Sequence, residues 1–315
     1  MKRLLLIGLA ALLLAGAINC KPAQSERSDG LCVVTTEFPV YDWILNLLGD
    51  NPAGVTLVLL NDTGLDPHSF QPGTDDILAI TQCDLFVYVG GASEQWATDA
   101  LHQPAIGRRT VLNLMETLGD AALTEEHVEG MQSDEEEEEP ETDEHIWLSI
   151  RNAVALCGAI ADALIALDPM HADAYRDNFA SYRDALNALD AAYRDAVGNA
   201  KLHTLLFADR FPFRYLVADY GLSYYAAFDG CSSESEASFE TIAFLAAKVD
   251  ALGLGAVLIL DGSDGRIAQT VVDSTGAKNQ KILTLDSMQS VGKQSTKTYL
   301  SVMESNLAVL KEALN

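Results

Sequence analysis

The stretch KLHTLLFADRFPFRYLVADYGLSYYAAF, residues 201–228, contains the pattern that decides the fold. Its first part, residues 201–209, is an apolar run of strand length, and residues 212–221 have helical spacing and end at a glycine. Residues 222–228 form a second apolar run. A strand, a helix and another strand in close succession predict parallel strands covered by helices, which is the arrangement of α/β proteins.

The same alternation continues on both sides of this stretch. Residues 238–253 predict a helix that is capped by Ser238 and ends at Gly253. The other segments of this kind are LCVVTTEFPVYDWILNLLGD (31–50), VTLVLL (55–60), TDDILAITQCDLFVYVG (74–90), RRTVLNL (108–114), LGAVLILD (254–261) and KILTLD (281–286).

Two segments interrupt the alternation and divide the chain. In residues 169–199, Tyr, Phe and Leu recur at helical spacing, which predicts one long helix. The predicted fold is therefore α/β, with two lobes, each a mostly parallel sheet flanked by helices, joined by this rigid connector helix. The N-terminal lobe spans residues 30–168 and the C-terminal lobe residues 200–315. An acidic loop, residues 125–144, interrupts the first lobe and is expected to be solvated and mobile, because nine of the eleven residues 134–144 are acidic.

The first twenty residues predict export. Lys2 and Arg3 precede a short apolar run, Leu4 to Ile18, which is typical of a secretory signal peptide. Cys20 follows directly, as in bacterial lipoproteins, where it becomes the lipidated first residue. The alternative is a plain cleaved signal, since Asn19 stands where lipoproteins carry a small residue. The predicted location is extracytoplasmic, on the outer face of the cell membrane, with the lipid on Cys20 as the anchor.

Composition and missing motifs exclude several classes of function. The net charge of −26 makes nucleic acid an unsuitable partner. The chain contains no GxGxxG, GxxxxGK[ST], GxSxG or HExxH motif, so dinucleotide, P-loop, serine-hydrolase and zincin chemistry are not indicated. We therefore do not expect an enzyme.

Four cysteines remain after the signal segment, and their spacing matches no zinc-finger pattern. Cys32 and Cys83 each lie at the start of an apolar run, and they are the first pair to expect if a disulfide forms. The alternative is that these two cysteines, together with Cys157 and Cys231, are buried free thiols.

Four side chains form a candidate metal site. His68 lies in the loop GLDPHSFQP, and His145 lies at the start of a helix after the acidic loop. Asp209 and Asp286 each end an apparent strand of the second lobe. Ligands bind at the carboxyl ends of parallel strands, so these residues could converge between the lobes. Imidazole and carboxylate suit Zn²⁺ and also Mn²⁺, whereas the alternative for His68 is an ordinary loop residue.

The sequence resembles the zinc- and manganese-type substrate-binding proteins of bacterial ABC importers over essentially the whole mature chain. The resemblance rests on the segments VVTTEFPVYDWILNLLGD, GLDPHSFQPGTDDILAITQCDLFVYVGG, EHIWLSIRNA, GCSSESEASFETI and TLDSM. It implies that His68, His145 and Asp286 are metal ligands. It further implies a monomer that captures Zn²⁺, or alternatively Mn²⁺, between its lobes and delivers it to a membrane permease.

One ligand position departs from this family. The family carries His or Glu at the start of the second lobe's first helix, where this chain has Arg210. Arginine has no lone pair for a cation, so Asp209 is the expected substitute. Three other functions stay open at this point, namely an adhesin-like interaction protein, a metallohydrolase, and an importer component for another substrate such as an iron chelate.

Overall fold

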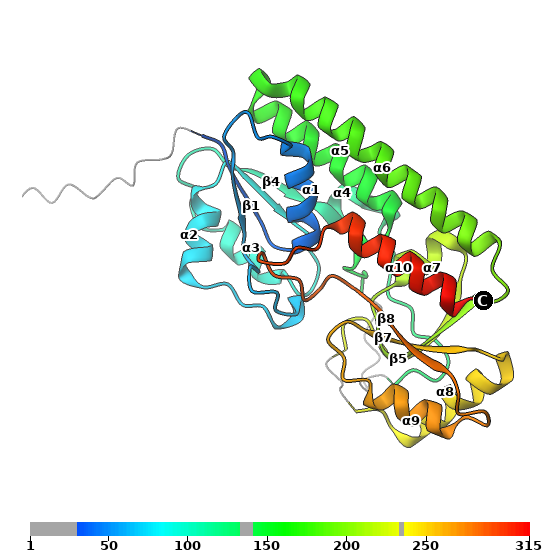
Figure 1. Cartoon of the computed structure of the whole chain (residues 1–315). Helices are drawn as coiled ribbons and strands as arrows, with labels where there is room; N and C mark the ends of the chain where they lie inside the picture. Colours follow the sequence, from blue (N-terminus) through cyan, green and yellow to red (C-terminus); the bar gives the residue numbers. More distant parts are fainter. Residues whose placement is uncertain (1–29, 133–140, 233–235) are drawn as a thin grey trace, which may run out of the picture. The chain divides into compact units, whose positions relative to one another are not determined.

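The computed structural model describes residues 30–132, 141–232 and 236–315 (Figure 1). Residues Leu31–Asn315 form one compact unit. The predicted signal peptide, Cys20 and most of the acidic run lie outside the described residues. Among the described residues of this unit, eight strands form two separate four-stranded sheets, and all the pairs between these strands are parallel. The prediction of an α/β protein with two parallel sheets is confirmed.

The first sheet has the strand order β2-β1-β3-β4. Its two central strands, β1 and β3, are almost entirely buried, because helices cover both faces of the sheet. The strands are β1 (Cys32–Thr35), β2 (Thr56–Leu59), β3 (Leu85–Tyr88) and β4 (Thr110–Asn113). The helices of this lobe are α1 (Phe38–Leu48), α2 (Thr74–Gln82), α3 (Gln95–Leu101), α4 (Leu114–Leu118) and α5 (Ile150–Leu167). Short 3₁₀ turns lie at Pro67–Ser69 (η1), Gly119–Ala121 (η2) and Ile146–Leu148 (η3).

The second sheet has the order β6-β5-β7-β8, which repeats the topology of the first. In both sheets the chain reverses its winding direction between the first and third strands, and such switch points open a crevice at the carboxyl ends of the strands. The strands are β5 (Thr204–Phe211), β6 (Ser223–Asp229), β7 (Ala256–Leu260) and β8 (Lys281–Leu285). The helices are α7 (Arg214–Tyr220), α8 (Phe239–Leu252), α9 (Arg266–Ser274) and α10 (Tyr299–Ala313).

The predicted ends of α8 are confirmed in detail. The side chain of Ser238 accepts a hydrogen bond from the Thr241 N–H, so one of the free donors of the first turn is satisfied. Gly253 follows the helix with φ +64°, a left-handed conformation that glycine adopts without strain. Local sequence chemistry therefore fixes this element before any tertiary contact is made.

A single long helix, α6 (Ala172–Gly198), runs along both lobes (Figure 1). It follows the 3₁₀ turn η4 (Pro169–His171) and packs against α1 and α5 on one side of the molecule and against α7 and α10 on the other. Its buried residues recur at helical spacing, and they include Tyr175, Tyr182 and Tyr193. The predicted aromatic stripe is thus part of the core.

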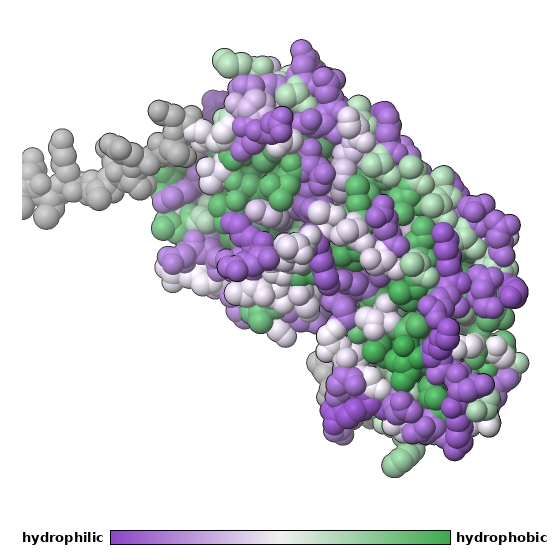
Figure 2. Space-filling model, in the orientation of Figure 1, coloured by the Kyte–Doolittle hydropathy of each residue, from purple (hydrophilic) through white to green (hydrophobic). Residues whose placement is uncertain are grey.

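Helix α5 is the one helix among the described residues that is long and apolar enough to cross a membrane, judged by length and composition alone. In this structure its buried residues, such as Leu156 and Ile160, belong to the hydrophobic core, and the helix packs along α6. Polar residues are spread between the apolar ones over the face of the molecule that Figure 2 shows. The buried apolar residues of α5 are therefore part of the core of this unit.

The acidic loop is more ordered at its ends than the sequence led us to expect. The Glu125 N–H donates to the Glu141 carbonyl, and Thr124 pairs with Thr142 in an antiparallel bridge. Asp143 and Glu144 are only 2% and 4% exposed. The expectation of a fully solvated loop is wrong for these last residues, because hydrogen bonds to neighbouring backbone and side chains offset the cost of burying them.

Candidate metal centre

His68 is held in a turn that packs against the second lobe. Asp66 caps this turn, since its Oδ1 accepts the His68 N–H at 3.1 Å. Gly64 has φ +72°, and a Cβ added there would lie 2.5 Å from the Gly292 nitrogen. The Lys293 N–H donates to the Asp62 carbonyl at 2.8 Å. The loop that carries His68 is thus fixed by backbone contacts with the segment that follows β8.

His145 is buried, and its ring has a defined orientation. One carboxylate oxygen of Asp143, Oδ1, lies 2.8 Å from the His145 N–H and 3.0 Å from its Nδ1. A carboxylate oxygen only accepts, so Nδ1 carries the hydrogen, and in the neutral ring Nε2 keeps a lone pair. Burial of the ring lowers the pKa of His145, but the charge and hydrogen bond of Asp143 outweigh burial and raise the pKa above its ordinary value. The pair is the carboxylate–histidine arrangement that supports metal ligands.

The two histidines meet, and a cysteine completes the group. The His68 and His145 rings have centroids 5.8 Å apart at an interplanar angle of 57°. Ligand atoms of His68, His145 and Cys231 all lie within 4.8 Å of one another. Across residues 30–132, 141–232 and 236–315, this is the one group of three or more His, Cys, Asp or Glu side chains with such spacing. It combines two nitrogen donors and one sulfur donor, which suits a tetrahedral metal such as Zn²⁺.

Gln289 also reaches this group. Its Nε2 lies 3.0 Å from His145 Nε2 and 3.5 Å from His68 Nε2, so it donates to the lone pair of His145. The residue is 3% exposed, and its carbonyl oxygen Oε1 has no hydrogen-bond partner in the described structure. Burying an acceptor without a donor costs folding free energy, so an oxygen such as Oε1 is rarely left without a partner.

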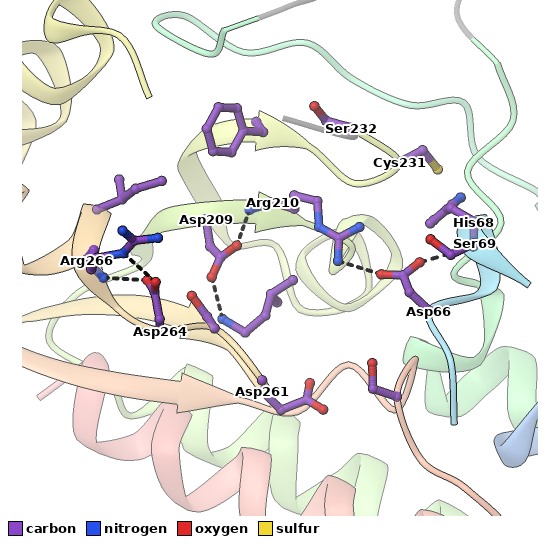
Figure 3. A pocket seen from close by; sticks show the side chains of 16 residues that line it. Asp66, His68, Ser69, Asp209, Arg210, Cys231, Ser232, Asp261, Asp264 and Arg266 are labelled. Carbon is purple, nitrogen blue, oxygen red and sulfur yellow. Dashed lines mark hydrogen bonds and ion pairs between the residues drawn. The ribbon is translucent and has the colours of Figure 1, made fainter. Parts of the chain in front are cut away.

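Asp209 lies beside a cavity of about 520 Å³ that His68 and Cys231 also line (Figure 3). Its carboxylate points to backbone: Oδ1 accepts the Arg210 N–H at 2.9 Å and Oδ2 accepts the Leu260 N–H at 3.1 Å. Strand β5 does not end at Asp209, as the sequence suggested, but continues to Phe211. Its pairing with β6 shifts register between Phe207 and Arg210, and this irregularity lets the side chain bond the neighbouring backbone. Asp209 is not part of the histidine–cysteine group.

Asp286 follows β8 directly, as predicted, but it too has other partners. Its Oδ1 accepts the Met288 N–H at 2.8 Å, and its Oδ2 lies 2.5 Å from Lys297 Nζ. Asp286 is likewise outside the group that His68 and His145 form with Cys231. The structure therefore brings together the two predicted histidines and leaves both predicted aspartates in separate hydrogen-bond networks.

Arg210 turns toward the first lobe. Its Nη2 lies 2.7 Å from Asp66 Oδ2, and each side chain is 24% exposed (Figure 3). Burial of Asp66 raises its pKa, but the hydrogen bond and charge of Arg210 outweigh this and hold the pKa below its ordinary value. The arginine thus links β5 to the carboxylate that caps the His68 turn.

Two members of the site, Cys231 and Gln289, were missed by the sequence analysis. Both lie just beyond the carboxyl ends of strands, since Cys231 follows β6 and Gln289 follows β8. The rule that selected Asp209 and Asp286 applies equally to them. The sequence pointed to the segment after β8, but to Asp286 and not to Gln289 in it, and it did not point to the loop after β6 that carries Cys231.

The remaining cysteines do not form the expected disulfide. Cys83 and Cys157 carry free thiols. The Cys83 sulfur donates to the Ile80 carbonyl at 3.2 Å, and burial raises the pKa of this thiol to about 12. Cys32 and Cys83 therefore form no disulfide in this structure.

Two parallel α/β lobes that share a long helix, with a histidine-containing site where their loops meet, define a two-lobed binding protein. The chain belongs to the family described as "Zinc-uptake complex component A periplasmic", whose model matches residues 33–313. The resemblance predicted from the sequence is confirmed.

Individual relatives support the same family. The chain is 31% identical to "Zinc-binding lipoprotein AdcA" of Streptococcus pneumoniae over 98% of its own length and 60% of that protein. It is 26% identical to "High-affinity zinc uptake system protein ZnuA" of Bacillus subtilis, covering 95% of this chain and 92% of that one. The chain thus spans about 60% of the length of the first curated relatives it matches.

Solved structures agree with the fold. The Zn(II)-bound ZnuA-like domain of Streptococcus pneumoniae AdcA superposes with a TM-score of 0.71 at 27% identity, covering 90% of this chain and 99% of that domain. The metal-dependent lipoprotein YcdH of Bacillus subtilis gives a TM-score of 0.75 at 25% identity, covering 90% of this chain and all of that one.

Proposed function

We propose that this protein captures Zn²⁺ outside the cytoplasm and delivers it to the permease of an ABC importer. The observation that carries the proposal is the meeting of His68 and His145 between the lobes, with Asp143 holding the lone pair of His145 toward the site. The family match and the zinc-binding relatives support the same function. No bond of a substrate is made or broken in this function, which is binding and release.

Zinc is favoured over manganese because of the donors that meet. Two imidazoles suit Zn²⁺ well, whereas Mn²⁺ prefers carboxylate and water oxygens. The sequence predicts Asp209 and Asp286 as oxygen ligands, and both remain predictions. Each would first have to give up the bonds described above, to backbone N–H groups and, for Asp286, to Lys297.

The cellular setting follows the sequence. We propose that the residues before Cys20 are removed and that a lipid on Cys20 anchors a monomer to the outer face of the membrane. Residues 30–168 and 200–315 would act as the two metal-binding lobes, with residues 169–199 as the connector. A metal that contacts loops of both lobes at once would stabilise the arrangement in which those loops are close.

Metal-dependent stabilisation tests this function. A ligand that binds only the folded protein adds RT ln(1 + [L]/Kd), roughly 4 kcal/mol at a thousandfold excess over Kd. Saturating Zn²⁺ should raise the melting temperature, and both His68→Ala and His145→Ala should remove most of the rise. His102→Ala, which changes an exposed histidine at the end of α3, is the matched control and should keep it. An undiminished rise in both site variants would refute the assignment.

A further inference from the structure

We propose that the sulfur of Cys231 and the side-chain carbonyl of Gln289 complete the metal site with His68 and His145. The inference rests on the proposed metal capture and specifies the donors that carry it out. It gives this chain a site of two nitrogens, one sulfur and one amide oxygen, with no carboxylate in direct contact with the metal.

The position of Cys231 supports a role as ligand. The loop that carries Cys231 packs closely on His145. A Cβ added at the preceding residue, Gly230, would lie 3.2 Å from His145 Cε1 and 2.9 Å from the Phe211 carbonyl oxygen. Its sulfur lies within 4.8 Å of both histidine donors, a spacing that one ion placed between them can bridge. The Cys231 thiol forms no disulfide. On binding, the metal–sulfur bond forms as the S–H proton leaves to solvent.

Gln289 provides the second, independent observation. Its Oε1 is buried without a donor, while its Nε2 donates to the nitrogen of His145 that a metal would occupy. The amide oxygen and NH₂ group have nearly the same size, so a half-turn of the amide exchanges them. Before metal binds, the NH₂ group caps the imidazole lone pair. After the half-turn, the unpartnered oxygen faces the metal, and the polar group that was unsatisfied gains its partner.

The charged groups around the site include Glu125, which accepts a hydrogen bond from the Cys231 thiol, and Glu144. One thiolate beside a divalent ion leaves a formal charge of +1, because both imidazoles and the amide are neutral. The Asp143 carboxylate bonds His145 and spreads part of this charge. Arg210, the nearby cation, is paired with Asp66 and is not left facing the metal alone.

A sulfur ligand changes which metals are accepted. Thiolate favours Zn²⁺ and other soft or borderline ions, including Cd²⁺, and disfavours Mn²⁺. We therefore expect the site to reject Mn²⁺ more strongly than one that uses the carboxylates of Asp209 and Asp286.

Cobalt titration of the full chain tests the sulfur. Co²⁺ bound by a thiolate shows a sulfur-to-metal charge-transfer band in the near ultraviolet. We expect this band in the wild type and in Cys83→Ser, whose hydroxyl can keep the hydrogen bond to Ile80. We expect its loss in Cys231→Ser, with a fall in Zn²⁺ affinity at least as large as the roughly 10–100-fold that loss of an outer-shell partner costs.

The outcomes separate the two proposals. A band that persists in Cys231→Ser, together with loss of binding in His68→Ala, would overturn the sulfur ligand and leave metal capture standing. A wild type that binds neither Co²⁺ nor Zn²⁺ would overturn both proposals.

Paired variants test Gln289. Gln289→Leu keeps a buried side chain, one bond shorter, and removes the whole amide with its oxygen, so it should weaken Zn²⁺ binding by about tenfold or more. Gln289→Glu supplies a charged oxygen at the same place and should bind at least as tightly as the wild type. Equal Zn²⁺ affinity in the wild type and Gln289→Leu would remove Gln289 from the site.

Discussion

A single methyl group at position 230 should disturb both the fold and the metal centre. Gly230 follows β6, and its backbone lies where the end of β5 and the His145 ring come together. In Gly230→Ala the new Cβ would lie 2.9 Å from the Phe211 carbonyl oxygen, 3.2 Å from His145 Cε1 and 3.3 Å from the Pro212 Cα. Two of these three neighbours are backbone atoms, which cannot move aside as a flexible side chain would.

The size of the effect follows from those contacts. Overpacking a tight site costs typically about 1–3 kcal/mol, because backbone and rotamers must shift to make room. At roughly 2–4 °C per kcal/mol for a domain of 150–250 residues, the melting temperature of the metal-free protein should fall by several degrees. The shift also moves Cys231 relative to His145. Further strain of about 1–3 kcal/mol that arises only in the metal-bound form would lower Zn²⁺ affinity by roughly 5–150-fold.

The assay is thermal unfolding in the presence of a chelator, followed by a Zn²⁺ competition titration against a chromophoric chelator. Gly255→Ala is the matched control, since a Cβ at that position meets nothing within 4 Å and its φ is not in the left-handed region. Gly255→Ala should leave both quantities close to those of the wild type. If Gly230→Ala is as stable as the wild type and binds Zn²⁺ as tightly, the close packing of the Cys231 loop on His145 is not what shapes the site.

Three further predictions follow from the same structure. Burial raises the pKa of Glu94 from 4.5 to about 7, so folding takes up a proton there, and the free energy of unfolding falls by up to about 3 kcal/mol as pH rises between these values. In urea unfolding, Glu94→Gln should have the same free energy of unfolding as the wild type at pH 5 and a larger one at pH 8. An equal difference between the two proteins at both pH values would contradict this. Asp209→Ala leaves the N–H groups of Arg210 and Leu260 without their acceptor, so it should lower the unfolding free energy by roughly 1–3 kcal/mol. Its Zn²⁺ affinity should change by a few-fold at most, and a fall in affinity of several orders of magnitude would identify Asp209 as a ligand. Bound Zn²⁺ should protect Cys231 from alkylation, as measured by mass spectrometry of peptides, and unchanged labelling of Cys231 with and without saturating Zn²⁺ would argue against a metal–sulfur bond.

The sequence was sufficient for the architecture. Short apolar runs separated by helical segments predicted parallel strands, and the signals at Ser238 and Gly253 predicted both ends of α8 correctly. These features depend on interactions within a few residues, such as a side-chain cap or a left-handed glycine, so the local sequence contains all the information they require. The family resemblance was visible for the same reason, because its motifs are short and contiguous.

The sequence predicted less accurately those features that depend on contacts between segments far apart in the chain. It ended β5 at Asp209, whereas the strand runs on to Phe211 through an irregular pairing with β6. It treated residues 134–144 as a solvated run, but Asp143 is buried because it bonds His145 and its carbonyl accepts the Tyr215 hydroxyl. Each difference involves a partner that is distant along the chain, namely β6 for the end of β5 and Tyr215 for Asp143.

For the metal centre, the sequence by itself selected the two histidines. The loop after a parallel strand is identifiable from hydrophobic pattern alone and drew attention to His68, and His145 was noticed at the start of a helix directly after the acidic loop. Which other side chains join them was decided by tertiary structure. Cys231 is brought to the histidines by the close approach of the Gly230 backbone to His145. Gln289 lies three residues beyond Asp286, yet it reaches both imidazoles while Asp286 is held by Lys297. The direction of a side chain in a loop depends on which neighbour satisfies it, and those neighbours come from other strands and from the other lobe.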